Sequence, residues 1–149
     1  MRARSFPGPP WPTLVETCDS LVAPDPVGFT RSMIENMLSD QLSPEDHEWI
    51  IAENLKFPRR HAATLLFNHS LLDWRDVMPR IDLPALVITG RSSVVPWASQ
   101  AWIHSVIQGS RLKIFETKQG GHHFAFLENP EGFNDLVASF MMETPDVEG

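Results

Sequence analysis

Two short segments of the chain carry side chains that could do nucleophilic or proton-transfer chemistry. Adjacent serines, Ser92 and Ser93, follow an apolar run, and adjacent histidines, His122 and His123, follow a pair of glycines. An imidazole can take a proton from a nucleophile and later return it to a leaving group. A hydroxyl can attack a carbonyl or orient an imidazole. The sequence therefore offers candidates for a general base and for its hydroxyl partner.

Both pairs also have plainer explanations. A strained nucleophile turn needs a glycine on each side of the serine, and Val94 follows Ser93 here. We therefore expect Ser92 and Ser93 to be turn residues rather than nucleophiles. Spacing alone favours the interpretation of His123 as a histidine in a glycine-rich surface turn that has no chemical role.

Adjacent histidines can also belong to a metal site. No cysteine accompanies His122 and His123, and no other histidine or acid recurs around them at ligand spacing. We therefore expect no metal and no other cofactor. The remaining histidines lie on predicted helices and are interpreted as surface or packing residues: His47, His61, His69 and His104.

The serines and the histidines both follow stretches that predict β-strands. Leu83–Ile88 is a nearly continuous apolar run, typical of a strand buried on both faces of a parallel sheet. Arg111–Glu116 alternates apolar and charged residues, and Trp97–Ile107 between the strands has helical spacing. Sites in open α/β sheets lie outside the carboxyl ends of the strands. The loop Arg91–Pro96 is therefore the first place to expect chemistry.

This second half is an incomplete sheet by itself. Two strands joined by one helix cannot bury their own faces or close their own edges. We therefore expect it to be the end of a larger sheet whose earlier strands are not in this chain. A last helix is predicted to begin at Asn129-Pro130.

The first half predicts helices and no strand. Met1–Pro12 holds four of the thirteen prolines, so an irregular lead-in is expected there. Thr13–Leu21 has a weak helical pattern. Clearer helices are expected from Asp25-Pro26, from Ser43-Pro44, where a cap residue precedes a proline, and from Arg59 to Leu72.

Composition restricts the class of protein. The chain has 149 residues, a net charge of -7 and one cysteine. The negative charge argues against nucleic-acid binding, and a single cysteine fits a reducing compartment. No apolar stretch is long enough to cross a bilayer, and the start lacks the apolar core of a signal peptide. We therefore expect a cytoplasmic protein with no membrane partner.

Two segments carry a resemblance to a known family. DWRDVMPRIDLPALVITGRSSVVP, followed by RLKIFETKQGGHHFAFLENPEGFNDLVASF, resembles the C-terminal half of an α/β-hydrolase. The resemblance implies an α/β fold: a helical cap, then the last strand-helix-strand-helix of a parallel sheet. On this basis residues 1–72 are expected to form the cap with its lead-in, 73–142 the core and 143–149 a flexible tail.

The resemblance also implies roles for individual residues. His123 falls at the family's general base, and Ser93 falls where the family usually has an acid. His122 and Val94 would line the substrate pocket. The family's nucleophile lies in a G-x-S-x-G turn, which occurs nowhere in this sequence. The nucleophile and the oxyanion hole are therefore expected outside this chain.

Two functions remain open from the sequence. In the first, the chain supplies the cap and the base of a serine hydrolase that acts on a small ester, lactone or amide. In the second, it is a non-catalytic module that binds a ligand or interacts with another protein. In either case, self-association or a partner that supplies the missing strands is expected.

Overall fold

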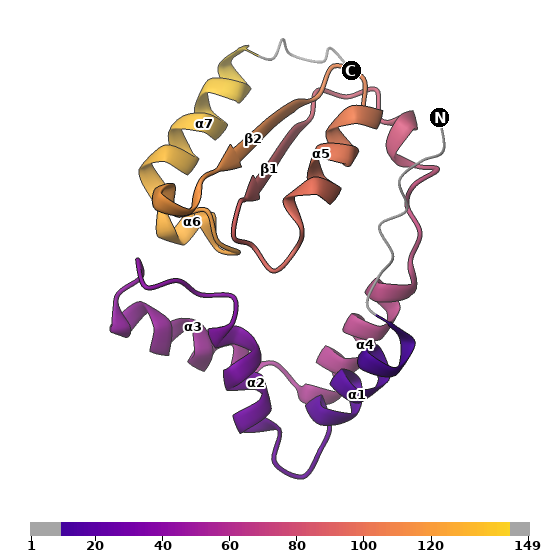
Figure 1. Cartoon of the computed structure of the whole chain (residues 1–149), viewed down its shortest axis with the longest axis vertical. Helices are drawn as coiled ribbons and strands as arrows, with labels where there is room; N and C mark the ends of the chain where they lie inside the picture. The colour runs from indigo at the N-terminus through magenta and orange to yellow at the C-terminus, as the bar shows by residue number, and fades with distance from the viewer. Residues whose placement is uncertain (1–9, 144–149) are drawn as a thin grey trace. The chain divides into compact units, whose positions relative to one another are not determined.

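A computed structural model describes residues 10–143 of the chain, which form two compact units (Figure 1). The helical unit, within the described residues, runs up to Asn36 and again from Ser43 to Trp74. The sheet unit comprises Met37–Leu42 and the chain from Arg75 onward.

Prolines mark the helix starts in the helical unit, which consists of α1 (Trp11–Leu21), α2 (Pro26–Glu35), α3 (Pro44–Lys56) and α4 (Arg59–Leu71). The first three helices each have proline in the first turn, where the backbone N–H that proline lacks would make no hydrogen bond within the helix. Ser43 caps α3 by accepting the Asp46 N–H. Helix α1 packs on α4 and α2, and α2 packs on α3.

The lead-in prediction was wrong at its end. It placed irregular chain as far as Pro12, whereas α1 already begins at Trp11. Pro12 lies in the first turn of that helix, where its fixed φ is compatible with helical backbone. The rest of the expected lead-in, residues 1–9, lies outside the described residues, as does the expected tail beyond Glu143.

The sheet unit is built around two parallel strands. Strands β1 (Leu86–Gly90) and β2 (Arg111–Phe115) pair in a register that places Leu86 opposite Arg111 and Gly90 opposite Phe115. Helix α5 (Trp97–Val106) connects them and packs on both. The remaining elements of this unit are η1 (Met78–Arg80), η2 (Thr117–Gln119), α6 (Ala125–Glu128) and α7 (Pro130–Glu143). In Figure 1, α5 and α7 lie to either side of the strand pair.

Two elements differ from the sequence prediction. The first strand begins at Leu86 rather than Leu83, because Pro84 has no N–H to donate and Leu83 is exposed. The short helix α6, between the Gly-His turn and α7, was not predicted. Within residues 10–143, no helix is both long and apolar enough to span a membrane.

Strand β1 has one open edge. Within the part of the chain that the structure describes, β1 pairs with β2 alone. Ala85 C=O accepts from Arg111 N–H, and Arg91 N–H donates to Phe115 C=O, so these residues are directed towards β2. Because alternate residues of a strand direct their backbone groups to opposite sides, those of Leu86 and Ile88 are directed to the open edge.

Candidate active site

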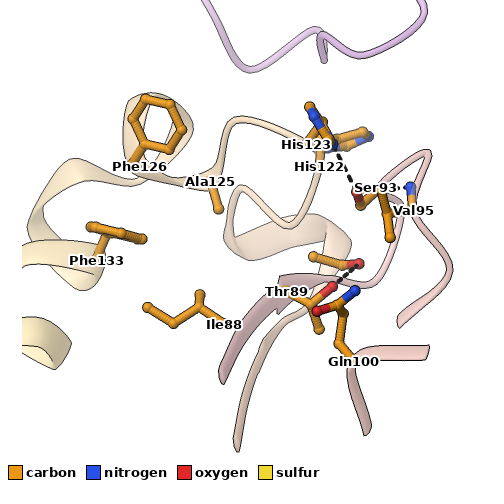
Figure 2. Close-up of a pocket in the computed structure, with 11 residues that line it drawn as sticks. Ile88, Thr89, Ser93, Val95, Gln100, His122, His123, Ala125, Phe126 and Phe133 are labelled. Carbon is orange, nitrogen blue, oxygen red and sulfur yellow. Dashed lines mark hydrogen bonds between the residues drawn. The ribbon is translucent and has the colours of Figure 1, made fainter. Parts of the chain in front are cut away.

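A pocket of about 260 Å³ lies in the sheet unit, where β1 ends (Figure 2). Its apolar wall consists of Ile88 from β1, Val95 from the loop that follows it, and Ala125, Phe126 and Phe133 from α6 and α7. Polar groups from the strand, the following loop, α5 and the Gly-His turn complete the lining: Thr89, Gly90, Ser93, Gln100, His122 and His123.

The structure brings Ser93 and His123 together in this pocket. Ser93 Oγ lies 3.2 Å from His123 Nδ1, and the ring tautomer decides which atom donates (Figure 2). Ser93 Oγ also accepts the Val95 N–H at 3.2 Å. Burial lowers the pKa of His123 below its ordinary value of 6.5, because desolvation penalises the charged ring. The imidazole is therefore neutral at neutral pH and can accept a proton.

Two glycines allow the loop after β1 to approach the Gly-His turn closely. A Cβ on Gly90 would overlap the carbonyl oxygens of Gly121 and His122. Likewise, a Cβ on Gly121 would overlap the carbonyl oxygen of Phe115. Ser92 N–H donates to Gly121 C=O at 2.8 Å and holds the two loops together. Glycine is required at both positions because no side-chain atom fits between these backbones.

Glu128 is a buried acid at this site that sequence reasoning did not single out. Its side chain is fully buried, and its Oε2 accepts the backbone N–H of His122 at 3.1 Å. The same oxygen lies 3.3 Å from His122 Nδ1. The available signal was its place in the GGHHFAFLENPE segment, five residues after His123.

The other predicted residues lie in or near the pocket. His122 lines it, whereas Val94 is about half exposed and its neighbour Val95 lines the wall instead. Gln100 and Phe126 were not predicted to contribute, since nothing in their spacing distinguishes them from ordinary helix residues. Among residues 10–143, no group of three or more His, Cys, Asp or Glu side chains could hold a metal ion.

Comparison with known proteins gives few sequence relatives. No family model matches the chain. An uncharacterised protein of Mycobacterium bovis and one of Mycobacterium tuberculosis are each 32% identical to it over 107 residues. That alignment covers 66% of this chain but only 30% of each relative.

Solved structures are similar to the chain at lower identity. A bromoperoxidase from Bacillus anthracis matches 89% of this chain with a TM-score of 0.81 and 17% identity. An esterase from Exiguobacterium antarcticum matches 89% with a TM-score of 0.78 and 18% identity. An enol-lactonase from Burkholderia xenovorans LB400 matches 89% with a TM-score of 0.74 and 18% identity. The chain spans about half of each, at 49%, 48% and 51% of their lengths.

Proposed function

Because this chain has the fold of an α/β-hydrolase over about half the length of its solved neighbours, we propose that it carries the general base of a serine hydrolase. The observation that supports this most directly is the 3.2 Å contact between Ser93 Oγ and His123 Nδ1 inside the pocket. A base held through Nδ1 presents its other ring nitrogen, Nε2, to a nucleophile.

The proposed mechanism begins with a neutral His123. Its Nε2 takes the proton of a serine hydroxyl as that oxygen attacks the substrate carbonyl, and later returns the proton to the leaving group. Ser93 orients the ring through Nδ1. A hydroxyl cannot stabilise the imidazolium as a carboxylate would, so the Ser93–His123 pair orients the base without supplying a compensating charge.

The nucleophile must come from residues outside this sequence, since no G-x-S-x-G turn occurs in it. We propose that the segment that supplies the nucleophile also supplies a strand beside β1. The open edge of β1 supports this, because unpaired backbone groups there are a template for another strand. That segment can belong to the same polypeptide or to a partner chain.

The pocket supports a small, largely apolar substrate. Its volume of about 260 Å³ lies just below the range of about 300–1,000 Å³ that is usual for ligand sites. Phe126 and Phe133 present aromatic surface, while Gln100 and Thr89 offer polar contacts. A short-chain ester, lactone or amide fits a small pocket with aromatic surface and few polar groups. The solved neighbours include proteins described as an esterase and an enol-lactonase.

The test is to complete the fold. The upstream half of the Exiguobacterium antarcticum esterase, joined before this chain, should give an enzyme that hydrolyses p-nitrophenyl acetate. His123→Ala should lower kcat by on the order of a thousandfold, because both nucleophile activation and proton return are lost. His122→Ala should lower kcat far less. His61→Ala, at an exposed position of the helical unit, is the matched control and should leave kcat unchanged.

Two results would contradict the proposal. A completed enzyme whose kcat is unaffected by His123→Ala would favour the non-catalytic binding module instead. The chain by itself should show no more hydrolysis than its own His123→Ala variant, because the nucleophile and oxyanion hole provide most of the rate enhancement. Turnover by the chain alone that a serine-directed phosphonate abolishes would also overturn it.

A further inference from the structure

Glu128 ends α6 beside the pocket with none of its side-chain surface exposed. Acidic side chains are almost never fully buried unless they are paired, because an ionised carboxylate loses its hydration. The proposed mechanism makes no use of this group. The burial of Glu128 is therefore explained by the polar groups that surround its carboxylate.

The nearest polar groups to the Glu128 carboxylate belong to His122. Oε2 accepts the His122 backbone N–H at 3.1 Å and lies 3.3 Å from His122 Nδ1. Within the described residues, His122 Nδ1 and Glu128 Oε1 are buried without a hydrogen-bond partner. With a proton on Nδ1, this ring nitrogen is a hydrogen-bond donor that lies 3.3 Å from a carboxylate oxygen.

The backbone around this pair leaves little room for another arrangement. Gly120 packs closely on Glu128 and Asn129, so a Cβ at this position would lie 2.9 Å from Glu128 Cβ and 3.0 Å from Asn129 Cβ. Asn129 Nδ2 donates to Gln119 C=O at 2.9 Å, on the other side of the same turn. Glu128 and Asn129 thus hold the backbone of the turn that carries His122.

We propose that Glu128 is a positioning residue that holds His122 as a hydrogen-bond acceptor for the substrate. With Nδ1–H directed to Glu128, the lone pair of His122 Nε2 is left for the pocket that this ring lines beside His123 (Figure 2). This inference rests on the proposed function, because it describes the substrate of the same pocket. The substrate class it selects is a small acyl compound with an O–H or N–H group next to its carbonyl.

The first test reads the His122 tautomer directly. In the chain labelled with 15N-histidine, ring-nitrogen shifts at pH 8 should show His122 protonated at Nδ1 and bare at Nε2. Magic-angle spinning gives the same reading if the chain self-associates, and the His122→Phe spectrum assigns the signals. Glu128→Ala should release the preference for Nδ1, whereas Glu131→Ala, at an exposed acid of α7, should not. A wild-type His122 that carries its proton on Nε2 would overturn the proposal, whether or not Glu128→Ala folds.

The second test measures the preference for a donor group. Methyl glycolate and methyl propionate differ mainly by a hydroxyl in place of a methyl group. The wild-type chain should bind methyl glycolate more tightly by roughly threefold to tenfold, the effect of one hydrogen bond. His122→Phe should abolish that preference, and equal affinity of the wild-type chain for both esters would refute the acceptor role. Neither test involves turnover, so a completed enzyme that fails to hydrolyse esters would contradict the proposed function and leave these two results standing.

Discussion

Ser93 Oγ and His123 Nδ1 lie 3.2 Å apart, although 30 residues separate them in the chain. The parallel pairing of β1 with β2 explains this proximity, because it places the carboxyl ends of both strands at the same edge of the sheet. Close packing of Gly90 against the carbonyl of Gly121 then brings the two following loops together. The imidazole therefore has a hydroxyl, rather than a carboxylate, at Nδ1.

Replacement of the Ser93 hydroxyl by a carboxylate should raise the pKa of His123. In Ser93→Asp a negative charge would face Nδ1 and favour the imidazolium, so the pKa of His123 should rise from its lowered value. NMR titration of the ring measures this. Ser92→Asp is the matched control, since the Ser92 hydroxyl faces Thr117 Oγ1 at 2.6 Å instead. An equal rise of the pKa of His123 in both variants would show that Ser93 has no special relation to that ring.

Burial of His123 also predicts how stability depends on pH. Its folded pKa lies below the ordinary value of 6.5, so between the two values the unfolded chain binds more protons than the folded chain. This residue should therefore reduce the free energy of unfolding as the pH falls below about 6.5, with no such loss above it. The urea midpoint of the sheet unit, followed by NMR from pH 8 to pH 5, should fall less in His123→Gln than in the wild type. A steeper fall in the variant would mean that His123 does not reduce the free energy of unfolding at low pH.

The close approach at Gly90 predicts a large cost for one added methyl group. In Gly90→Ala the new Cβ would overlap two backbone carbonyls, and backbone cannot rotate away as a side chain can. We expect a loss of about 1–3 kcal/mol or more in the free energy of unfolding of the sheet unit. Gly28→Ala is the control, because nothing lies within 4 Å of its Cβ position in α2. That change should stabilise the helical unit by about 0.5–1 kcal/mol through helix propensity. Equal effects in urea unfolding of the two units would contradict the packing account.

The sequence predicted most of the elements because their signals are local. Helical spacing, together with proline in the first turn, located α2 and α3. The apolar run located β1, and the alternation of apolar and charged residues located β2. The expected fold class, a partial α/β-hydrolase, is confirmed. Strand limits were less accurate, because the ladder of β1 is set by its register with β2 and not by the apolar run alone.

The site was less accessible to sequence reasoning, because its geometry depends on contacts between distant segments. Whether Val94 or Val95 lines the pocket follows from the turn that Ser93 Oγ makes with the Val95 N–H. The burial of Glu128 follows from α6, a four-residue helix too short to give a periodic signal. The roles of His123, Ser93 and His122 stay predictions until their variants are measured, and the role of Val94 also stays a prediction.

The open edge of β1 predicts that the chain by itself associates. An apolar strand with unpaired backbone groups recruits another strand, so size exclusion with light scattering should show assemblies rather than a clean monomer. Leu86→Pro should shift the chain towards monomer, because it removes an N–H directed to the open edge and leaves the bonds to β2 intact. Val87→Pro is the matched control one residue along, and it should destabilise the sheet unit by removing an N–H directed to β2. A wild-type monomer with a cooperative thermal transition would show that β1 needs no further strand.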